Sequence, residues 1–339
     1  MIIQQDISLK HLNTFGIDVW AKYFSIFTSI NDLQEIFEGN AKGQTPNPLI
    51  LGGGSNILFT KNVNGLVLKN EIKGIEKINE DDDHVYIQAG AGENWHSFVM
   101  HCLENNYAGI ENLALIPGNV GASPMQNIGA YGVEIKDTFH SLEAFNIEEK
   151  KTVSFNKADC AFGYRESVFK NKYKGQFIIT SVTYKLNKNP VFNISYGAIK
   201  EELEKMKLHE LNIRNIAQAV MNIRSSKLPD PKVIGNAGSF FKNPEIDIIL
   251  FEKLLAQFPN IVGYKLNDGK VKLAAGWLIE HCGWKGYRKG DAGCHEKQAL
   301  VLVNYGNAKG SEIFDLSTEI LMSVKDKFNV TLEREVNII

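Results

Sequence analysis

Residues 116–132, IPGNVGASPMQNIGAYG, form the most unusual stretch of this 339-residue sequence. They contain four glycines, two prolines and no charged residue, with serine, glutamine and asparagine interspersed. This composition is typical of an ordered, largely buried loop whose backbone and amide groups bind a flat, polar molecule. An Ω-loop packed by its own side chains is the alternative. We favour a ligand, because small residues on both sides leave space that a self-packed loop would fill.

A second glycine-rich segment, LGGGSNIL at residues 51–58, precedes that loop in the chain. Three consecutive glycines let the backbone approach a ligand and point successive N–H groups at phosphate oxygens. Ser55 and Asn56 add side-chain donors. The segment lacks the Gly-Lys-Ser/Thr of a P-loop and the G-x-G-x-x-G of a dinucleotide fold. A tight turn without a ligand therefore stays an equally good interpretation.

A third such segment, GNAGSFFKNP at residues 235–244, places Ser239 after a glycine. A serine nucleophile needs a histidine base that is itself held by a third group. The G-x-S-x-G pattern of serine hydrolases is absent from the sequence, so hydrolysis is disfavoured. By chemistry alone, Ser239 is also compatible with an ordinary hydrogen-bonding turn.

The composition excludes several classes of protein. Hydrophobic residues make up 44% and charged residues 22%, which is enough for a large core and rules out a disordered chain. Lys plus Arg total 37 against 39 Asp plus Glu, so the net charge of −2 predicts no nucleic-acid or anionic-membrane partner. No apolar run is long enough to span a membrane, and the N-terminus is no signal peptide. We expect a cytoplasmic protein.

The four cysteines contain no C-x-x-C pair and do not resemble a disulfide framework. His281-Cys282 and Cys294-His295 form a mirrored pair of zinc-type ligands, but the spacing matches no common zinc site. Buried free thiols are the favoured interpretation.

Hydrophobic periodicity predicts short strands with few helices in the first half and more helix in the second. We expect a helix over 95–105 and a strand over 177–186 with Ile178, Thr180, Val182, Tyr184 and Leu186 on one face. The turn-forming residues 187–190 end the first domain. Three later helices are predicted from the apolar stripes 216–223, 251–258 and 313–324. The fold class is therefore α+β.

Seven motifs that occur in register along the chain point to a known family. They are LGGGSN (51–56), residues 116–132, FGYRES (162–167), KLPDP (227–231) with GNAGSFFKNP, AAGWLIE (274–280), HEKQALVLVN (295–304) and LEREV (332–336). Together they resemble the UDP-N-acetylenolpyruvoylglucosamine reductases, flavoenzymes that complete UDP-N-acetylmuramate in bacterial peptidoglycan synthesis. The match is to the longer form of the family, whose tyrosine-bearing loop fits residues 195–197.

The resemblance implies a vanillyl-alcohol-oxidase (PCMH-type) FAD-binding domain of two subdomains over residues 14–186. A substrate-binding domain over 187–325 and a C-terminal strand over 326–339 that returns to the active site would follow. FAD would be bound non-covalently. NADPH would reduce it and leave, and the UDP-N-acetylglucosamine enolpyruvate would then enter the same place. A monomer is expected. The implied cofactor-binding residues are Gly52, Gly53, Gly54, Ser55, Asn56, Pro117, Gly118, Gly121, Ala122, Ser123, Gln126, Asn127 and Gly129.

The resemblance also assigns three catalytic residues. Arg165 would hold the substrate carboxylate, Ser239 would donate a proton, and Glu335 would assist enol formation. On a strand, Glu333 and Glu335 face the same way, so the sequence alone does not choose between them. The implied substrate-binding residues are Tyr131, Tyr164, Tyr196, Arg224, Lys227, Asn243 and Gln298.

Two residues beside Glu335 depart from the family pattern. Arg334 stands where proline is more common, and Asn337 replaces a common basic residue. Two other hypotheses compete with the reductase: a flavin-dependent oxidase or dehydrogenase of the same fold, and a nucleotide-binding module without redox activity.

Overall fold

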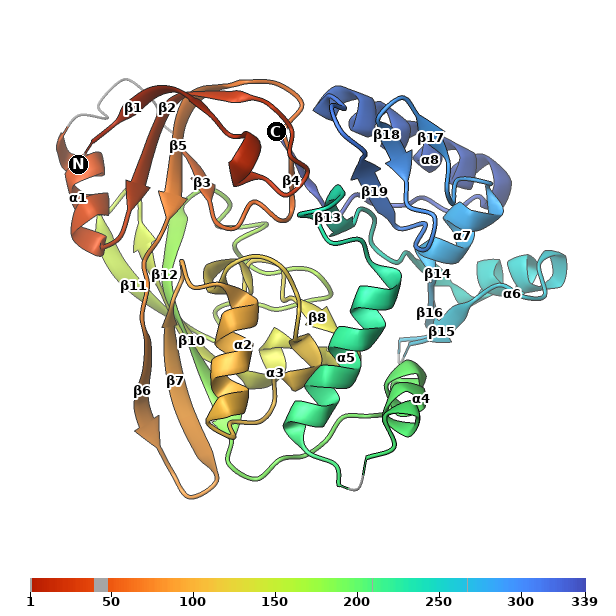
Figure 1. The fold of residues 1–339 in the computed structure, drawn as a ribbon, viewed down its shortest axis with the longest axis horizontal. Coiled ribbons are helices and arrows are strands. Elements are labelled where there is room, and N and C mark those ends of the chain that lie inside the picture. The colour runs from red at the N-terminus through yellow and green to blue at the C-terminus, as the bar shows by residue number, and fades with distance from the viewer. Residues whose placement is uncertain (1, 40–47, 209, 267) are drawn as a thin grey trace. The chain divides into compact units, whose positions relative to one another are not determined.

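The computed structural model describes residues 2–39, 48–208, 210–266 and 268–339 (Figure 1). Its contacts divide the chain into two compact units, which are described one at a time. The first comprises Met1–Ile7, Ala21–Gly53 and Val63–Ser226, and the second Ser8–Trp20, Gly54–Asn62 and Lys227–Ile339. Residues 187–226 thus cluster with the first unit, whereas the domain limits at residues 186 and 325 are functional boundaries that stay a prediction.

The first unit begins with a four-stranded sheet of order β1-β2-β5-β3. Its strands are β1 (Gln4–Ser8), β2 (Trp20–Phe27), β5 (Val63–Asn70) and β3 (Leu49–Leu51). β5 pairs in parallel with both β2 and β3. The helix α1 (Ile30–Gly39) supplies Leu33 to a buried cluster with Phe27 and Leu66. β3 runs directly into the glycine segment 52–54, so this sheet positions the start of that loop.

A second sheet in the first unit is antiparallel and has five strands, in the order β11-β10-β12-β7-β6. They are β11 (Lys151–Asn156), β10 (Phe139–Asn146), β12 (Phe177–Asn187), β7 (His84–Gly90) and β6 (Ile75–Glu80). The predicted strand over 177–186 is confirmed, but its single apolar face is wrong. The register shifts between Glu143 and Ala144, so Ile178 joins the cluster around Phe27 whereas Val182, Tyr184 and Leu186 join a second core.

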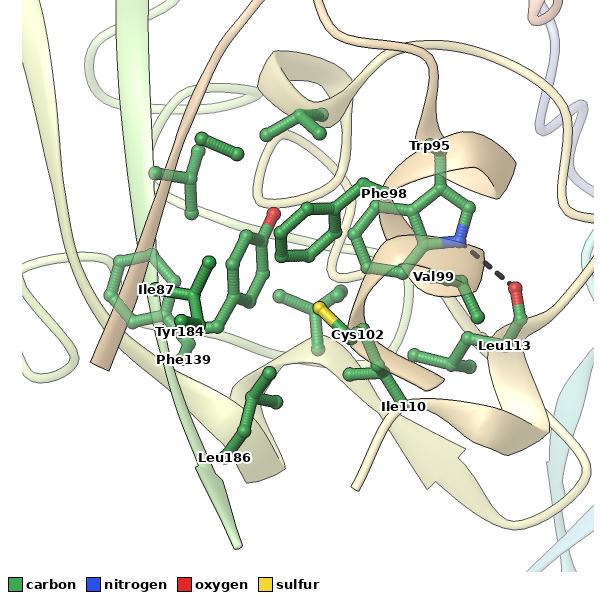
Figure 2. Close-up of a cluster of buried hydrophobic side chains, with 14 of the residues drawn as sticks. Ile87, Trp95, Phe98, Val99, Cys102, Ile110, Leu113, Phe139, Tyr184 and Leu186 are labelled. Atoms are coloured by element: carbon green, nitrogen blue, oxygen red, sulfur yellow. Dashed lines mark hydrogen bonds between the residues drawn. The ribbon is translucent and has the colours of Figure 1, made fainter. Parts of the chain in front are cut away.

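That second core lies between the five-stranded sheet and the helices of the unit (Figure 2). α2 (Trp95–Glu104) confirms the helix predicted over 95–105 and buries Trp95, Phe98, Val99 and Cys102. The Trp95 indole N–H donates to the Leu113 carbonyl at 2.9 Å, so the helix is also fixed by a polar contact. The other elements are η2 (Glu111–Leu113), η3 (Val120–Ala122), β8 (Gly129–Ala130), β9 (Val133–Glu134), α3 (Ile135–Thr138), α4 (Gly197–Met206) and α5 (Ile213–Lys227).

Most described strands of the second unit form small antiparallel sheets, and helices accompany them (Figure 1). One sheet has the order β13-β19-β18-β17 and the other β14-β16-β15. Their strands are β13 (Gly235–Ser239), β19 (Val301–Asn304), β18 (Ala292–Cys294), β17 (Arg288–Lys289), β14 (Glu245–Asp247), β16 (Lys270–Leu273) and β15 (Gly263–Lys265). The helices are α6 (Ile248–Gln257), α7 (Ala275–His281) and α8 (Gly310–Phe328), and η1 (Lys10–Leu12) lies near the start of the chain.

The last strand of the chain pairs with a strand that follows the glycine segment. β20 (Asn337–Ile338) runs parallel to β4 (Ile57–Leu58). The predicted helices at 251–258 and 313–324 are confirmed, although α6 buries Leu254 and leaves Leu255 40% exposed.

No helix in the described part of the chain is long and apolar enough to cross a membrane. The described residues also contain no group of three or more His, Cys, Asp or Glu side chains that could hold a metal. All four cysteines are free, and Cys102, Cys160 and Cys294 are buried, as predicted.

Candidate active site

The first two glycines of the segment 52–54 lie in the first unit, against the loop 116–132. A Cβ built on Gly53 would lie 2.8 Å from both the Gly118 Cα and the Asn119 Oδ1, closer than real Cβ contacts come. Gly118 itself has a φ of 110°, a conformation that favours glycine. The Asn119 amide donates to the Gly92 carbonyl at 2.7 Å. The glycine segment and the loop 116–132, which the sequence analysis identified separately, are therefore packed together. Their contact requires glycine at position 53.

Two lysines bind glycine carbonyls in this region. Lys69 donates to the Gly52 carbonyl at 2.5 Å, and Lys73 donates to the Gly92 carbonyl. Both lysines also pair with Glu71, at 3.2 and 3.1 Å. Burial raises the pKa of Glu71, but the hydrogen bonds from the two lysines outweigh burial, and the pKa is lowered. Because C=O and N–H point in opposite directions across a trans peptide, the Gly53 N–H points away from Lys69.

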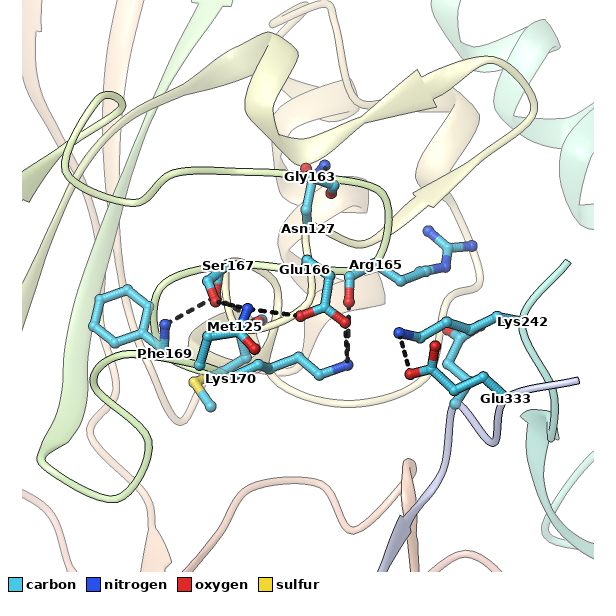
Figure 3. Close-up of polar contacts among 12 residues, drawn as sticks. Met125, Asn127, Gly163, Arg165, Glu166, Ser167, Phe169, Lys170, Lys242 and Glu333 are labelled. Carbon is cyan, nitrogen blue, oxygen red and sulfur yellow. Dashed lines mark hydrogen bonds and ion pairs between the residues drawn. The ribbon is translucent and has the colours of Figure 1, made fainter. Parts of the chain in front are cut away.

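Ser123 and Asn127, both predicted to bind a cofactor, use their side chains within the protein. The Ser123 hydroxyl hydrogen-bonds the Tyr184 hydroxyl at 2.7 Å in the core. The fully buried Asn127 donates to the Gly163 carbonyl at 2.9 Å (Figure 3). It also donates to the Glu134 carboxylate at 3.0 Å. These side chains hold the shape of the loop, which leaves its backbone available to a ligand. Tyr184 was expected only as a core residue, and its hydrogen bond to this loop was not predicted.

The other predicted cofactor residues are distributed along the same two segments. Pro117 and Ala122 are exposed, and Gln126 and Gly129 are half-buried. Gly121 lies so close to the end of β7 that a Cβ on it would come within 2.6 Å of the Ala91 Cβ. The contacts at Gly118 and Gly121 thus leave no room for a side chain at Gly53 or Gly121.

A cluster of positive charge lies in the same unit. Arg224 on α5 is half-buried, and its Nε is inaccessible and has no hydrogen-bond partner among the described residues. Arg224 also hydrogen-bonds the Tyr131 hydroxyl. Burial lowers the pKa of Arg224, and the nearby charge of Arg165 lowers it further. Two close guanidinium groups of this kind suit an anion such as a carboxylate.

Arg165 is held in a strained conformation. Its φ is 56°, and its guanidinium donates to the Gly129 carbonyl at 2.7 Å. The Tyr164 ring lies beside the same guanidinium, 5.6 Å from its centroid to the Arg165 Cζ. Residues in such backbone conformations persist only where their surroundings hold them, and functional residues are often among them.

His96 was not predicted, but it lies close to Arg224. Its Nδ1 accepts the N–H of Leu115 at 3.1 Å, and Leu115 has a φ of 60° at the start of the loop 116–132. Burial lowers the pKa of His96, and the charge of Arg224 lowers it further, so the imidazole is neutral at neutral pH. In sequence, His96 follows a buried tryptophan on a helix and gave no separate indication of a role.

The tyrosine-bearing loop is fastened to the turn at Tyr131 by two asparagines that were not predicted from the sequence either. Asn112 donates to the Tyr131 carbonyl at 3.0 Å and to the Asn193 carbonyl at 2.9 Å. Asn193 in turn donates to the Gly132 carbonyl at 3.0 Å. The rings of Tyr131 and Tyr196 meet edge to face, with centroids 5.3 Å apart. Tyr196 remains 46% exposed.

In the second unit, Ser239 and Glu335 lie on paired segments. The Glu335 N–H donates to the Phe240 carbonyl at 2.8 Å, and the Lys242 N–H donates to the Glu333 carbonyl at 2.9 Å. Phe241 and Arg334 form the antiparallel bridge between these hydrogen bonds. This pairing places Glu335 beside the residue that follows Ser239.

The same pairing distinguishes the two glutamates. Lys242 is only 7% exposed, and its ammonium binds the Glu333 carboxylate at 2.6 Å (Figure 3). Glu335 is fixed differently, since Asn56 donates to its carbonyl at 3.3 Å. Asn337 donates to the Asn56 carbonyl from both its backbone and its side chain, at 3.1 and 2.9 Å. The departure at Asn337 thus supports the segment that carries Glu335.

The remaining glycine of the segment, Gly54, is required within the second unit. A Cβ on Gly54 would lie 2.0 Å from the Leu12 carbonyl oxygen, and its φ is 64°. The Thr14 N–H donates to the Gly54 carbonyl at 3.0 Å. Ser55, which follows, is half-buried.

Two predicted substrate residues of the second unit converge on α7. The Asn243 Oδ1 accepts the Ala275 N–H at 3.0 Å, and the Gln298 Oε1 lies 3.1 Å from an ideal Cβ on Gly276. The motif AAGWLIE therefore meets both residues at the first turn of this helix. Lys227, at the C-terminal end of α5, is exposed.

Comparisons with known proteins agree along the whole chain. Residues 230–339 match the family model of the UDP-N-acetylenolpyruvoylglucosamine reductase C-terminal domain, and residues 21–153 match an FAD-binding domain model. Relatives named UDP-N-acetylenolpyruvoylglucosamine reductase from Flavobacterium johnsoniae and Amoebophilus asiaticus are each 52% identical over 100% of both chains. One from Pseudomonas syringae pv. syringae is 48% identical over 99% of this chain and 98% of its own.

A solved structure shares the fold. The crystal structure of UDP-N-acetylenolpyruvylglucosamine reductase from Thermus caldophilus covers 99% of both chains with a TM-score of 0.69, at 22% identity.

Proposed function

The chain belongs to the UDP-N-acetylenolpyruvoylglucosamine reductase family, and from this premise we propose how its own residues carry out the family's reaction. The protein is an FAD-containing oxidoreductase with a PCMH-type FAD-binding fold. It uses NADPH to reduce UDP-N-acetylglucosamine enolpyruvate to UDP-N-acetylmuramate in peptidoglycan synthesis. Among this chain's own residues, the half-buried pair Arg165 and Arg224 beside Tyr131 supports the assignment most.

The loops of the first unit fit FAD. Glycines at the close contacts keep the backbone open, and the Gly53 N–H points away from Lys69, so this N–H could donate to a diphosphate oxygen. When bound, FAD accepts a hydride from NADPH and supplies a hydride to the alkene of the substrate. Ser123 and Asn127 shape the loop through their internal hydrogen bonds. The backbone of residues 52–56, Pro117, Gly118, Gly121 and Ala122, with Gln126 and Gly129, would provide the contacts.

Arg165 and Arg224 would bind the carboxylate of the enolpyruvyl group. Reduction of the alkene places negative charge on the enolate of that carboxylate, which a guanidinium stabilises best through two parallel hydrogen bonds. The bond from Arg165 to the Gly129 carbonyl and the ring of Tyr164 orient its planar fork. Tyr131 keeps its proton because burial raises its pKa, so its hydroxyl is available as a hydrogen-bond donor.

Ser239 would donate the proton to the carbon next to the carboxylate, and Glu335 would assist enol formation. A hydroxyl is a weak acid, so it needs a neighbouring group to supply or relay the proton. Glu335 is on the segment paired with residues 240–242, whereas the Glu333 carboxylate is engaged by Lys242. The backbone pairing of Glu335 with Phe240, the residue after Ser239, supports Glu335 in this role.

The nucleotide part of the substrate would be bound by Tyr196, Lys227, Asn243 and Gln298. In this proposal residues 14–186 form the cofactor domain, 187–325 the substrate domain and 326–339 the segment that brings Glu335 to the active site.

We also propose that the enzyme acts as a monomer in the cytoplasm, which sedimentation and cell fractionation would test.

The proposal is tested by separating the two half-reactions. The purified protein should be yellow, and NADPH should bleach it under anaerobic conditions. Addition of UDP-N-acetylglucosamine enolpyruvate should restore the colour and yield one UDP-N-acetylmuramate per flavin. Fast reoxidation by air together with no response to the enolpyruvyl compound would instead indicate an oxidase, and a colourless protein would contradict both.

A further inference from the structure

Arg334, the residue between the two glutamates of LEREV, does not share their face of the segment. Leu332 and Val336 are each 4% exposed, and Arg334 alternates with them, so these three residues form the inner face. Glu333 and Glu335 therefore project from the opposite face. A charged residue between two buried apolar residues requires partners.

Its partners are on α8. The Arg334 Nε donates to the Ser317 hydroxyl at 2.8 Å, and its Nη2 donates to the Thr318 hydroxyl at 2.7 Å. The guanidinium also covers the Phe314 ring, with 4.5 Å between the Arg334 Cζ and the ring centroid.

The Ser317 and Thr318 hydroxyls act as acceptors toward Arg334, because their own protons are used elsewhere. Both donate their own protons to the Phe314 carbonyl, at 2.6 Å from Ser317 and 3.1 Å from Thr318. Ser317 is fully buried, so its hydroxyl has no contact with solvent while the guanidinium is in place. The planar guanidinium of Arg334 thus binds both hydroxyls of this turn of α8 at once. A lysine ammonium would not reproduce this geometry.

The backbone geometry explains why this anchor acts on Glu335. Arg334 occupies the non-hydrogen-bonded position of the antiparallel bridge with Phe241, while Glu335 and Glu333 make the flanking backbone hydrogen bonds. The backbone bonds fix the distance between the paired segments. Rotation of the short segment about its own axis is limited instead by what its inner face binds.

We propose that Arg334 is a positioning residue, which sets the orientation of Glu335 by docking its guanidinium onto the hydroxyls of Ser317 and Thr318. This proposal rests on the proposed role of Glu335 in the second half-reaction. The proposal gives a function to the arginine that stands here in place of proline. Its side chain restrains the segment that carries Glu335.

The experiment uses the holoenzyme of four variants: Arg334→Ala, Arg334→Lys, the double variant Ser317→Ala/Thr318→Val, and Arg288→Ala. The last is a matched control, because Arg288 likewise covers a ring, Tyr305 at 4.3 Å, and pairs with Asp291 elsewhere in the second unit. Flavin content, anaerobic reduction by NADPH, and reoxidation by UDP-N-acetylglucosamine enolpyruvate are measured separately. Hydrogen exchange of the Glu335 amide is followed in parallel.

We expect the first three variants to keep their flavin and their rate of reduction by NADPH. Reoxidation should slow by roughly tenfold to a hundredfold, the cost of a small misplacement of a reacting group, and the Glu335 amide should exchange faster. The control should match the wild type in every measurement. Should Arg334→Ala fail to fold, Arg334→Lys and the double variant decide the question by the same criteria.

Reoxidation within about twofold of wild type would overturn the proposal. So would an equal fall in both half-reactions, which would indicate a purely structural role. If wild-type protein itself is not reoxidised by the enolpyruvyl compound, the proposed function fails; the exchange of the Glu335 amide still shows whether Arg334 orders that segment.

Discussion

The first unit fixes Arg165, Arg224 and Tyr131 by side-chain contacts, whereas the second unit fixes Ser239 and Glu335 by backbone pairing. Tyr131 and Arg165 have positive φ values of 50° and 56°, and asparagine amides and a glycine carbonyl hold them there. Glu335 is held by the bond from its N–H to the Phe240 carbonyl and by the Arg334 anchor.

The difference indicates where each unit is sensitive to mutation. A loop held by side-chain amides loosens when one amide is removed, because each replaces a backbone partner that regular structure would provide. A backbone-paired segment keeps its distance from its partner when a side chain that anchors nothing is removed, so a substitution at Ser239 reports more directly on chemistry than one at the Arg334 anchor. The following predictions test this contrast, from the largest expected effect to the smallest.

The largest effect is expected at Gly53. In Gly53→Val a branched side chain would occupy space already filled by the Gly118 Cα and the Asn119 Oδ1, both within 2.8 Å. The protein should purify colourless or with little flavin, and its melting temperature should fall. Gly52→Ala is the matched control, since its Cβ would lie an ordinary 3.8 Å from the nearest atom. A fully yellow Gly53→Val protein would refute the role of this contact in binding FAD.

Ser239→Ala should slow reoxidation of the reduced flavin by substrate by roughly 10²–10⁴-fold, the usual contribution of a general acid. Flavin content and reduction by NADPH should not change, because backbone pairing fixes this segment. Ser239→Cys should keep more activity than the alanine variant, since a thiol also delivers a proton. Single-turnover stopped flow under anaerobic conditions measures this, with Ser311→Ala on α8 as control. If Ser239→Ala is reoxidised at the wild-type rate, the proton comes from another group.

Arg165→Lys should retain the charge but lose the second hydrogen bond to the carboxylate. We expect turnover with the enolpyruvyl substrate to fall by about tenfold to a hundredfold, corresponding to the roughly 1.5–3 kcal/mol of a hydrogen bond to a charged group. Reduction by NADPH should stay near wild type. Arg214→Lys, an exposed arginine that donates to the Glu104 carbonyl at 3.3 Å, is the control. Equal losses in both half-reactions would assign Arg165 to the nicotinamide nucleotide or to structure.

Asn193→Ala should produce the smallest of these effects. It removes the bond to the Gly132 carbonyl and so loosens the loop that carries Tyr196, at a cost of about 1 kcal/mol. The KM for the sugar nucleotide should rise about fivefold while the KM for NADPH stays constant. Asn105→Ala removes a comparable amide bond at the end of α2 and should change neither constant. An equal rise in both KM values would mean that the loop serves both substrates.

Much of this molecule is predictable from neighbouring residues in the sequence. The α+β class, the stripe of α2, the glycine segments and the motifs that mark the family all depend on short-range patterns. Periodicity and turn chemistry act over a few residues, so a window of the sequence contains them completely. The strand over 177–186 shows the limit, because a register shift at one position sends Ile178 to a different core from Val182.

The tertiary structure alone decided what the residues of the segment LEREV and the departures near Glu335 contact. Lys242 engages Glu333, Arg334 turns toward α8, and Asn56 reaches the Glu335 carbonyl across 279 residues of sequence. It also turned Ser123 and Asn127 inward and brought His96, Asn112 and Asn193 to the predicted residues. The sequence by itself determined the chemical groups and their family; which of them meet depends on strand register and on side-chain hydrogen bonds between distant segments, which no local pattern encodes.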